Sequence, residues 1–313
     1  MRETVGTFRA MNTDIQLVIV AEAGEEFEAD MALRDVENLF ANVEAAISRF
    51  RSESELSRLN ESAGKPFQAS PLLFTLVARA LAAARETNGI FDPTILGPLA
   101  AAGYDRSFEL LEHNKVSPAF LPGAGRAYSW RDVYVDAETS TIILPRGCGL
   151  DLGGIGKGWT ADRGAERLSR FNDYAVDAGG DIFVSGTQFD GRRWTVAVED
   201  PFNQECDIFT ITVRDRAVAT STIARRHWPV AGTDQHHLID PRTGLPSKSG
   251  VISATVVANS VVCADVLAKV ALLLGPDLGL RFLEGQPDAE GLLVLCDGKM
   301  QCTRDFGELK YVA

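Results

Sequence analysis

The sequence predicts an α+β fold, arranged as one continuous unit over residues 1–313. Windows with apolar residues at three- and four-residue steps, as on one face of a helix, alternate with short β-branched runs typical of strands. No Pro/Ser-rich linker and no internal repeat divides the chain. Hydrophobic residues make up 45% of the sequence, a globular composition with enough chain to bury a large core. We therefore expect mixed β-sheets with helices packed against them.

The first third of the chain is expected to hold a hairpin and two helices. Residues 5–21 carry a strand-like apolar run beside the turn signal Asn12-Thr13-Asp14. Residues 31–50 repeat apolar positions at helical spacing. The next helix opens at Ser70-Pro71, an N-cap residue followed by a proline in the first turn, and stops at Asn88-Gly89.

The remainder is expected to be richer in strands. A strand at residues 147–152 precedes a glycine-rich turn and a helix at residues 157–172. The other expected elements are strands at 194–198, 208–213 and 251–257, a helix at 260–275 and a hairpin turn at Asp297-Gly298.

Charge and composition exclude several classes of protein. The chain has 31 Lys+Arg against 43 Asp+Glu, a net charge of -12, without the clustered basic residues of a nucleic-acid surface. Its longest apolar runs fall well short of the roughly 20 residues of a membrane-spanning helix. Residues 1–5 lack the features of an export signal, and the five cysteines form no Cys-x-x-Cys pair. A cytoplasmic protein with reduced thiols and no transmembrane segment is expected.

The segment from Leu150 to Trp159 is the densest unusual stretch, because a strand-like run enters several glycines just before a helix. Glycines let a ligand approach the backbone, and a helix N-terminus attracts phosphate. The glycine spacing nevertheless fits neither the phosphate-loop template nor the dinucleotide template. The spacing alone leaves a phosphate site and a structural turn both open.

Four further clusters allow both a functional and a structural interpretation. Asp177–Asp181 reads as an Asp/Gly turn, and Gly89–Thr94 as a helix-ending turn in which Phe91 could stack on a flat ring and Asp92 accept hydrogen bonds. A histidine of His236–Gly244 could act as a general base, while the absence of Cys or Glu at ligand spacing argues against zinc. Asp265 and Lys269 are four residues apart on the helix expected at 260–275. They either form an exposed ion pair, or Asp265 is an acid among apolar residues that needs a metal or a cation to stay ionised.

In order and spacing, these clusters resemble the ApbE family of FAD:protein FMN transferases over nearly the whole chain. The matching stretches are Met11–Asp14, Ile47–Asn60, Gly89–Thr94, Leu150–Gly158, Asp177–Asp181, Ala219–Ser221, His237–Gly244 and Ala264-Asp265.

The resemblance implies an α+β fold around a flavin cleft, with FAD as substrate and Mg²⁺ at its pyrophosphate. It also implies transfer of FMN to a Ser or Thr of a target flavoprotein, which the sequence does not identify, with release of AMP. Carried over by position, the family's flavin contacts fall on Met11, Phe50, Ile90, Phe91, Asp92, Asp151, Lys157 and Ile239. The metal position falls on the Gly154 carbonyl and the Asp265 carboxylate, and the candidate base on His237.

One departure from the family pattern concerns the metal. Lys269 stands where many members have a Thr whose hydroxyl helps to hold the metal. A protonated Lys cannot be a ligand and repels Mg²⁺, so it either swings aside or replaces one cation. Lys269 thus favours an alternative function: an FAD-binding protein with no transferase activity, or with only slow hydrolysis of FAD to FMN and AMP.

Overall fold

The computed structural model describes residues 1–111, 128–230 and 232–311, which form two compact units. Unit 1 comprises Met1–Asn42, Lys157–Thr222 and Ser249–Ala313, and unit 2 comprises Val43–Gly156 and Ile223–Lys248. The α+β class is confirmed, whereas a single transferase unit over residues 1–313 stays a prediction. Over the part of the chain that is described, no helix is both long and apolar enough to cross a membrane.

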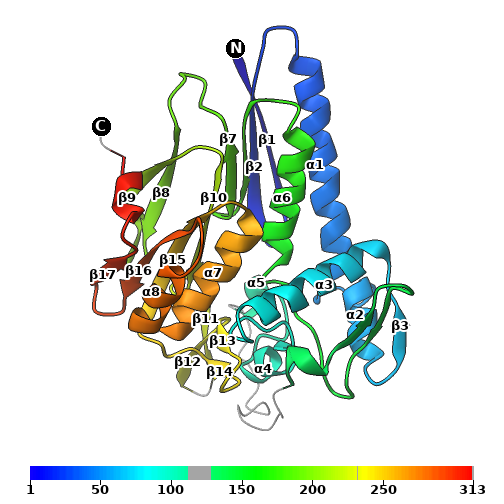
Figure 1. The fold of residues 1–313 in the computed structure, drawn as a ribbon. Helices are drawn as coiled ribbons and strands as arrows, with labels where there is room; N and C mark the ends of the chain where they lie inside the picture. Colours follow the sequence, from blue (N-terminus) through cyan, green and yellow to red (C-terminus); the bar gives the residue numbers. More distant parts are fainter. Residues whose placement is uncertain (112–127, 231, 312–313) are drawn as a thin grey trace. The chain divides into compact units, whose positions relative to one another are not determined.

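Unit 1 is built on an eight-stranded antiparallel sheet, ordered β1-β2-β6-β7-β10-β15-β16-β17 (Figure 1). Its strands are β1 (Arg2–Ala10), β2 (Thr13–Ala21), β6 (Asp173–Ala178), β7 (Ile182–Ser185), β10 (Arg216–Thr222), β15 (Val251–Ala258), β16 (Glu290–Leu295) and β17 (Met300–Cys302). The other elements of this unit are helices α1 (Glu26–Ile47), α6 (Gly156–Leu168), α7 (Val261–Leu274) and α8 (Pro276–Glu284), the hairpin β8 (Trp194–Asp200) and β9 (Asn203–Val213), and the 3-10 helix η2 (Phe306–Leu309). Residues 43–47 at the end of α1 and Gly156 at the start of α6 are assigned to unit 2.

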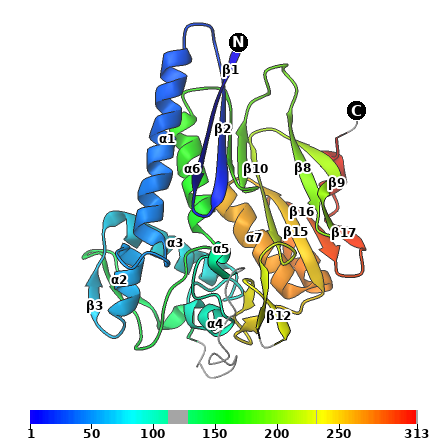
Figure 2. The ribbon, with the colours of Figure 1, turned by 180° about the vertical axis from the view of Figure 1, so that it is seen from behind.

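The large sheet separates two apolar layers, because successive strand residues point to opposite faces. Val176 of β6 faces α6, where it lies close to Gly164. Its neighbour Ala175 points the other way, into a core shared with the β8–β9 hairpin and η2. Helices α1, α6 and α7 lie along one face of the strands (Figure 1 and Figure 2). Unit 1 is therefore a layered structure that fixes α6 and α7 beside each other.

Unit 2 combines short helices with small sheets. Its helices are α2 (Glu55–Glu61), α3 (Pro71–Glu86), α4 (Leu96–Ala101), α5 (Phe108–Leu111) and the 3-10 helix η1 (Trp130–Asp132). Its sheets are β3 (Pro66–Gln68) with β5 (Thr141–Ile143) and β4 (Tyr134–Asp136), and the hairpins β11 (His227–Val230) with β12 (Thr233–His236) and β13 (Ile239–Asp240) with β14 (Leu245–Pro246). An apolar cluster that includes Tyr104, Trp228 and Ile239 forms one of its cores.

The strongest local signals of the sequence are confirmed. Ser70 caps α3, since its hydroxyl accepts a hydrogen bond from the Leu73 amide at 3.2 Å. The hairpin predicted around Asn12 is β1–β2, and the turn predicted at Asp297-Gly298 joins β16 to β17. The predicted helix at 31–50 is α1, but it begins at Glu26 and ends at Ile47, which leaves Phe50 outside it.

The predicted strand at residues 147–152 is wrong. This segment belongs to no strand, because its backbone groups are bonded to side chains and loops instead of a neighbouring strand. The Asn60 side chain accepts from the Leu150 amide at 2.8 Å and donates to the Leu150 carbonyl at 2.9 Å. The Asp151 amide donates to the carbonyl of Pro93 at 2.8 Å. The segment is therefore held by separate hydrogen bonds from distant residues and not by a strand partner.

Helix α7 differs from the amphipathic helix expected at 260–275. The expected inward residues are buried, and so are Val262, Val266 and Val270 on the other faces. Strands β10 and β15 contact it on one side, and α8 contacts it as well. A helix covered on several sides is apolar nearly all round, so Asp265 lies in an apolar setting.

Candidate functional site

The predicted site residues are divided between the two units. Unit 1 contains Met11, Lys157 and Asp265. Unit 2 contains Phe50, Ile90, Phe91, Asp92, Asp151, Gly154, His237 and Ile239.

In unit 2, Arg49 contacts both Asp151 and an aromatic platform formed by the rings of Phe50 and Tyr104. Its Nε atom lies 2.7 Å from Oδ2 of Asp151, in an ion pair whose side chains are only 8% and 12% exposed. Its guanidinium carbon lies 4.1 Å from the ring centre of Phe50 and 4.4 Å from that of Tyr104. Phe50 is 40% exposed. The cluster thus offers a solvent-accessible aromatic ring supported by a buried cation.

Three stretches of the family resemblance meet around Asp151. Its side chain accepts a hydrogen bond from the Gly153 amide at 2.9 Å, and its amide is bonded to Pro93. Asn60 holds the preceding residue, Leu150, by two hydrogen bonds. The turn that contains Gly154 is therefore fixed from several directions.

Asp92 and Phe91 are buried, so little of either side chain is open to a ligand. The Asp92 carboxylate accepts hydrogen bonds from the Thr94 amide and hydroxyl at 2.9 and 2.7 Å, and from the Trp130 amide at 3.1 Å. Burial raises the pKa of the Asp92 carboxyl, and these hydrogen bonds oppose the rise. Phe91 is only 4% exposed. Both residues shape the turn at 89–94, and their contact with flavin stays a prediction.

The two adjacent histidines have different environments. The Nδ1 atom of His236 accepts from the Leu238 amide at 3.3 Å, so Nε2 carries the proton that is donated to the Ser247 carbonyl at 2.9 Å. Burial lowers the pKa of His236. Both of its ring nitrogens are engaged, so His236 is a structural residue. His237, the next residue, is half-buried and stays a candidate base. Ile239 belongs to the apolar cluster that contains Tyr104 and Trp228.

In unit 1, two tight turns lie at the same end of the sheet. Met11 and Asn12 connect β1 to β2 with φ values of 51° and 63°, and Gly179 and Gly180 connect β6 to β7 with φ values of 70° and 92°. Gly179 packs directly against the Thr13 side chain. A methionine with positive φ is uncommon, and such backbone strain is concentrated at functional sites.

Lys157, in the first turn of α6, is ion-paired with Asp181. The Lys157 side chain is 21% exposed and the Asp181 side chain 4%. Burial raises the pKa of nearby Asp177, against the opposing effects of the Gly180 amide and the Lys157 charge. An ammonium is thereby held at the start of a helix, where backbone N–H groups also favour anions.

The first turn of α7 is attached to α6. Asp162 accepts hydrogen bonds from the Val261 and Val262 amides at 2.7 and 3.0 Å, and Ser260 accepts from the Cys263 amide at 3.2 Å. Burial raises the pKa of Asp162, while the two amides lower it. The first free amides of α7 are therefore satisfied by side chains.

One turn further along α7, Asp265 forms an ion pair with Lys269. The Lys269 Nζ atom lies 3.6 Å from the Asp265 Oδ1 atom, and the two side chains are 15% and 10% exposed. The pair is therefore largely buried, and the interpretation as an exposed surface pair is wrong. Within residues 1–111, 128–230 and 232–311, no three His, Cys, Asp or Glu side chains group as a metal site.

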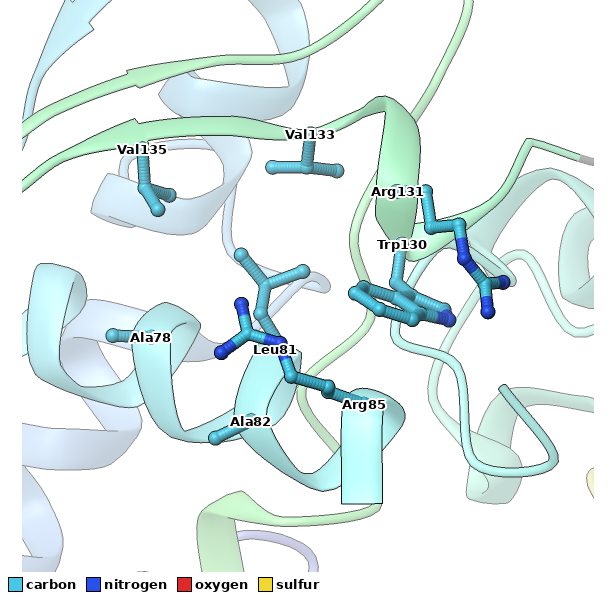
Figure 3. Close-up of a pocket in the computed structure, with 8 residues that line it drawn as sticks. All are labelled: Ala78, Leu81, Ala82, Arg85, Trp130, Arg131, Val133 and Val135. Atoms are coloured by element: carbon cyan, nitrogen blue, oxygen red, sulfur yellow. The ribbon is translucent and has the colours of Figure 1, made fainter. Parts of the chain in front are cut away.

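A separate cavity of about 500 Å³ lies in unit 2 (Figure 3). Figure 3 shows Leu81 and Arg85 of α3 facing Trp130 and Val133. None of the predicted site residues lines it. It adjoins the turn at 89–94 through Trp130, whose amide donates a hydrogen bond to the Asp92 carboxylate at 3.1 Å.

Sequence reasoning missed four residues that organise the site: Arg49, Asn60, Asp162 and Asp181. Arg49 and Asn60 lie in the stretch Ile47–Asn60 and Asp181 lies in Asp177–Asp181, but no role was predicted for any of the three. Asp162 and Arg49 gave no local signal, because their partners Val261 and Asp151 are about a hundred residues away in sequence.

Comparisons with known proteins show the family to which the chain belongs. A sequence profile described as the ApbE family matches residues 11–293. The chain belongs to the ApbE family. A relative from Treponema pallidum named FAD:protein FMN transferase is 30% identical over 296 residues, which cover 88% of this chain and 80% of the relative. One from Vibrio cholerae with the same name is 31% identical over 261 residues, which cover 80% of this chain and 75% of the relative.

Solved structures of ApbE proteins share the fold. The crystal structure of the ApbE protein from Thermotoga maritima has a TM-score of 0.86 at 24% identity, with 99% of this chain and 100% of that one covered. The flavin transferase ApbE from Vibrio cholerae has a TM-score of 0.81 at 26% identity, with coverage of 98% and 99%. The ApbE-type fold expected from the sequence is thus confirmed for this member of the family.

Proposed function

We propose that the protein transfers the FMN part of FAD to a Ser or Thr hydroxyl of a target flavoprotein and releases AMP, with Mg²⁺ as cofactor. Membership of the ApbE family and the shared name of the two relatives support the transferase activity. The structural observation that carries the proposal is the ammonium of Lys157, which Asp181 holds at the glycine-rich start of α6. That arrangement suits the pyrophosphate of FAD.

The reaction is a phosphoryl transfer. The acceptor oxygen forms a bond to the phosphorus of the FMN part, and the bond from that phosphorus to the AMP oxygen breaks. AMP leaves with the electron pair, and His237 takes the proton of the attacking hydroxyl. Lys157 neutralises negative charge on the phosphates, so positioning and electrostatics lower most of the barrier.

The residues that the resemblance gives as flavin contacts differ in exposure. Phe50 supplies the exposed aromatic surface, and Ile90 and Met11 supply partly exposed contacts. Phe91, Asp92 and Ile239 are nearly buried, so they would support the flavin pocket from behind. Asp151 would act through the turn that its side chain holds.

The oxygen donors suit Mg²⁺, which prefers hard oxygen ligands and takes much of its coordination from phosphates and water. The Asp265 carboxylate and the Gly154 carbonyl would hold the ion. When bound, Mg²⁺ would add positive charge at the pyrophosphate. A cytoplasmic location stays a prediction.

One observation favours the alternative of FAD binding without transfer. The ammonium of Lys269 lies 3.6 Å from Asp265 and already balances the carboxylate that would hold the metal. A protein of that kind would retain FAD, or would hydrolyse it slowly with water in place of the acceptor hydroxyl.

The test measures AMP release from FAD in the presence of a peptide that carries an acceptor threonine, with Mg²⁺ and with a chelator. The transferase predicts AMP release that is sensitive to the chelator and is abolished by Asp265→Ala. Asp297→Ala is the matched control, because Asp297 is exposed and also pairs with a lysine, Lys299, at 2.8 Å. Retained FAD without AMP release in the unmodified protein would support the alternative.

A further inference from the structure

We propose that Arg49 is a positioning residue that holds two parts of the flavin site at once, the Phe50 ring and the turn from Asp151 to Gly154. Its effect on catalysis rests on the proposed function, whereas its effect on the turn can be measured without any substrate.

The guanidinium of Arg49 has three kinds of contact. It forms the ion pair with Asp151, it donates through Nη1 to the Tyr104 carbonyl at 2.7 Å, and it stacks on the rings of Phe50 and Tyr104. The fixed planar fork of arginine can satisfy these contacts together, whereas the ammonium of lysine is a point charge. The orientation of Arg49 is therefore set from several sides.

The ion pair transmits this orientation to the turn. Asp151 uses Oδ2 for Arg49 and Oδ1 for the Gly153 amide, so one carboxylate links the guanidinium to the backbone next to Gly154. Both side chains are nearly buried, at 8% and 12% exposure. Loss of the guanidinium leaves a buried carboxylate without its charge partner, and the carboxylate must then reorient.

The same guanidinium supports the platform. The Phe50 and Tyr104 ring centres are 5.8 Å apart at an interplanar angle of 55°, and Arg49 contacts both rings. Tyr104 is anchored in turn on Trp228, with 5.1 Å between ring centres. The exposed ring of Phe50 is thus connected through Arg49 to the buried aromatic core.

The experiment compares Arg49→Met with Arg51→Met. Arg51 lies two residues away and pairs with Glu44 at 3.4 Å, but its side chain is 47% exposed. Hydrogen exchange of residues 150–156 is measured without FAD, and kcat and KM for FAD are measured well below the melting temperature. We expect Arg49→Met to speed exchange in this segment and to lower kcat/KM by about 10–100-fold, the range typical when a residue that orients a metal-binding side chain is removed. Arg51→Met should change neither.

Two further variants keep the test decisive. Arg49→Lys retains the charge without the fork, so it should speed exchange even if Arg49→Met folds poorly. With Asp151→Asn already present, Arg49→Met should cost much less than in the wild-type protein, because the two residues act through one link.

Exchange and kcat/KM in Arg49→Met and Arg49→Lys that match the Arg51→Met control would overturn the proposal, as would fully additive losses in the double variant. A wild-type protein that transfers no FMN would refute the proposed function, while the exchange data would still decide the role of Arg49.

Discussion

The carboxylate of Asp162 lies 2.7 Å from the backbone nitrogen of Val261, so a side chain of α6 caps the N-terminus of α7. Gly158 allows this approach, because a Cβ atom there would come within 3.2 Å of the Val261 backbone. The first turn of α7, the helix that carries Asp265, is thus joined to α6, the helix that carries Lys157.

Replacement of Asp162 by alanine should lower the free energy of unfolding by about 1–2 kcal/mol, since two amides lose their acceptor. Denaturant unfolding measures the change. Glu166→Ala on the same helix is the control, because Glu166 and its partner Arg163 are 57% and 45% exposed. Equal losses in the two variants would refute the cap as a source of stability.

His236 should make stability depend on pH. Its pKa is lowered in the folded protein, so the unfolded chain binds more protons in this range and stability rises with pH. The contribution is fully present above the ordinary pKa of about 6.5 and is lost as the pH falls from there toward the lowered value. Unfolding at pH 7.5 and pH 5.5 should show a smaller loss on acidification for His236→Asn than for the wild type. The same loss in both proteins would show that another group is responsible.

Gly179 should tolerate alanine less well than its neighbour Gly180. Both have positive φ, but a Cβ atom on Gly179 would overlap the Thr13 hydroxyl, whereas one on Gly180 would meet no atom within 4 Å. Gly180→Ala should lower the free energy of unfolding by about 1 kcal/mol, because alanine is strained at positive φ. Gly179→Ala should cost a further 1–3 kcal/mol, roughly, for overpacking. Similar melting temperatures for the two variants would contradict the packing at Thr13.

The sequence predicted elements where the decisive interactions are local. Ser70 caps α3 through a residue three positions later, and Met11-Asn12 turns one strand into its immediate neighbour. It failed at residues 147–152, where Leu150 has strand-like neighbours but takes its hydrogen bonds from Asn60, 90 residues earlier. The periodicity of apolar residues cannot show that a side chain, and not a neighbouring strand, accepts the backbone hydrogen bond.

The same limit applies to the candidate site. The residue types around Lys157 and Asp265 could be located from motifs, because the motifs are short and contiguous. The residues that orient them come from distant parts of the sequence and could not be located in this way. Asp181 pairs with Lys157, Arg49 pairs with Asp151, and Asp162 accepts hydrogen bonds from the first turn of α7.

Replacement of Lys269 by methionine should strengthen Mg²⁺ binding. The ammonium 3.6 Å from Asp265 would repel the ion, and Met removes the charge while filling similar space. Repulsion of at least about 1 kcal/mol corresponds to a roughly fivefold lower Mg²⁺ concentration at half-maximal AMP release. A higher Mg²⁺ requirement or a loss of activity would show that Lys269 itself serves as one of the cations.

His237→Asn should lower kcat for FMN transfer by roughly 10²–10⁴-fold, the usual contribution of a general base. KM for FAD should change little, because the proposed role concerns the acceptor proton. His236→Asn provides the comparison, since His236 has both ring nitrogens engaged by the protein. An unchanged kcat in His237→Asn would remove this residue from the mechanism.

The most direct test of FMN transfer is the mass of an acceptor peptide after incubation with the protein, FAD and Mg²⁺. The account predicts a mass gain of one FMN on the threonine, with one AMP released for each modified peptide. AMP release with an unmodified peptide, across peptides from several flavoproteins, would contradict transfer and leave hydrolysis of FAD as the activity.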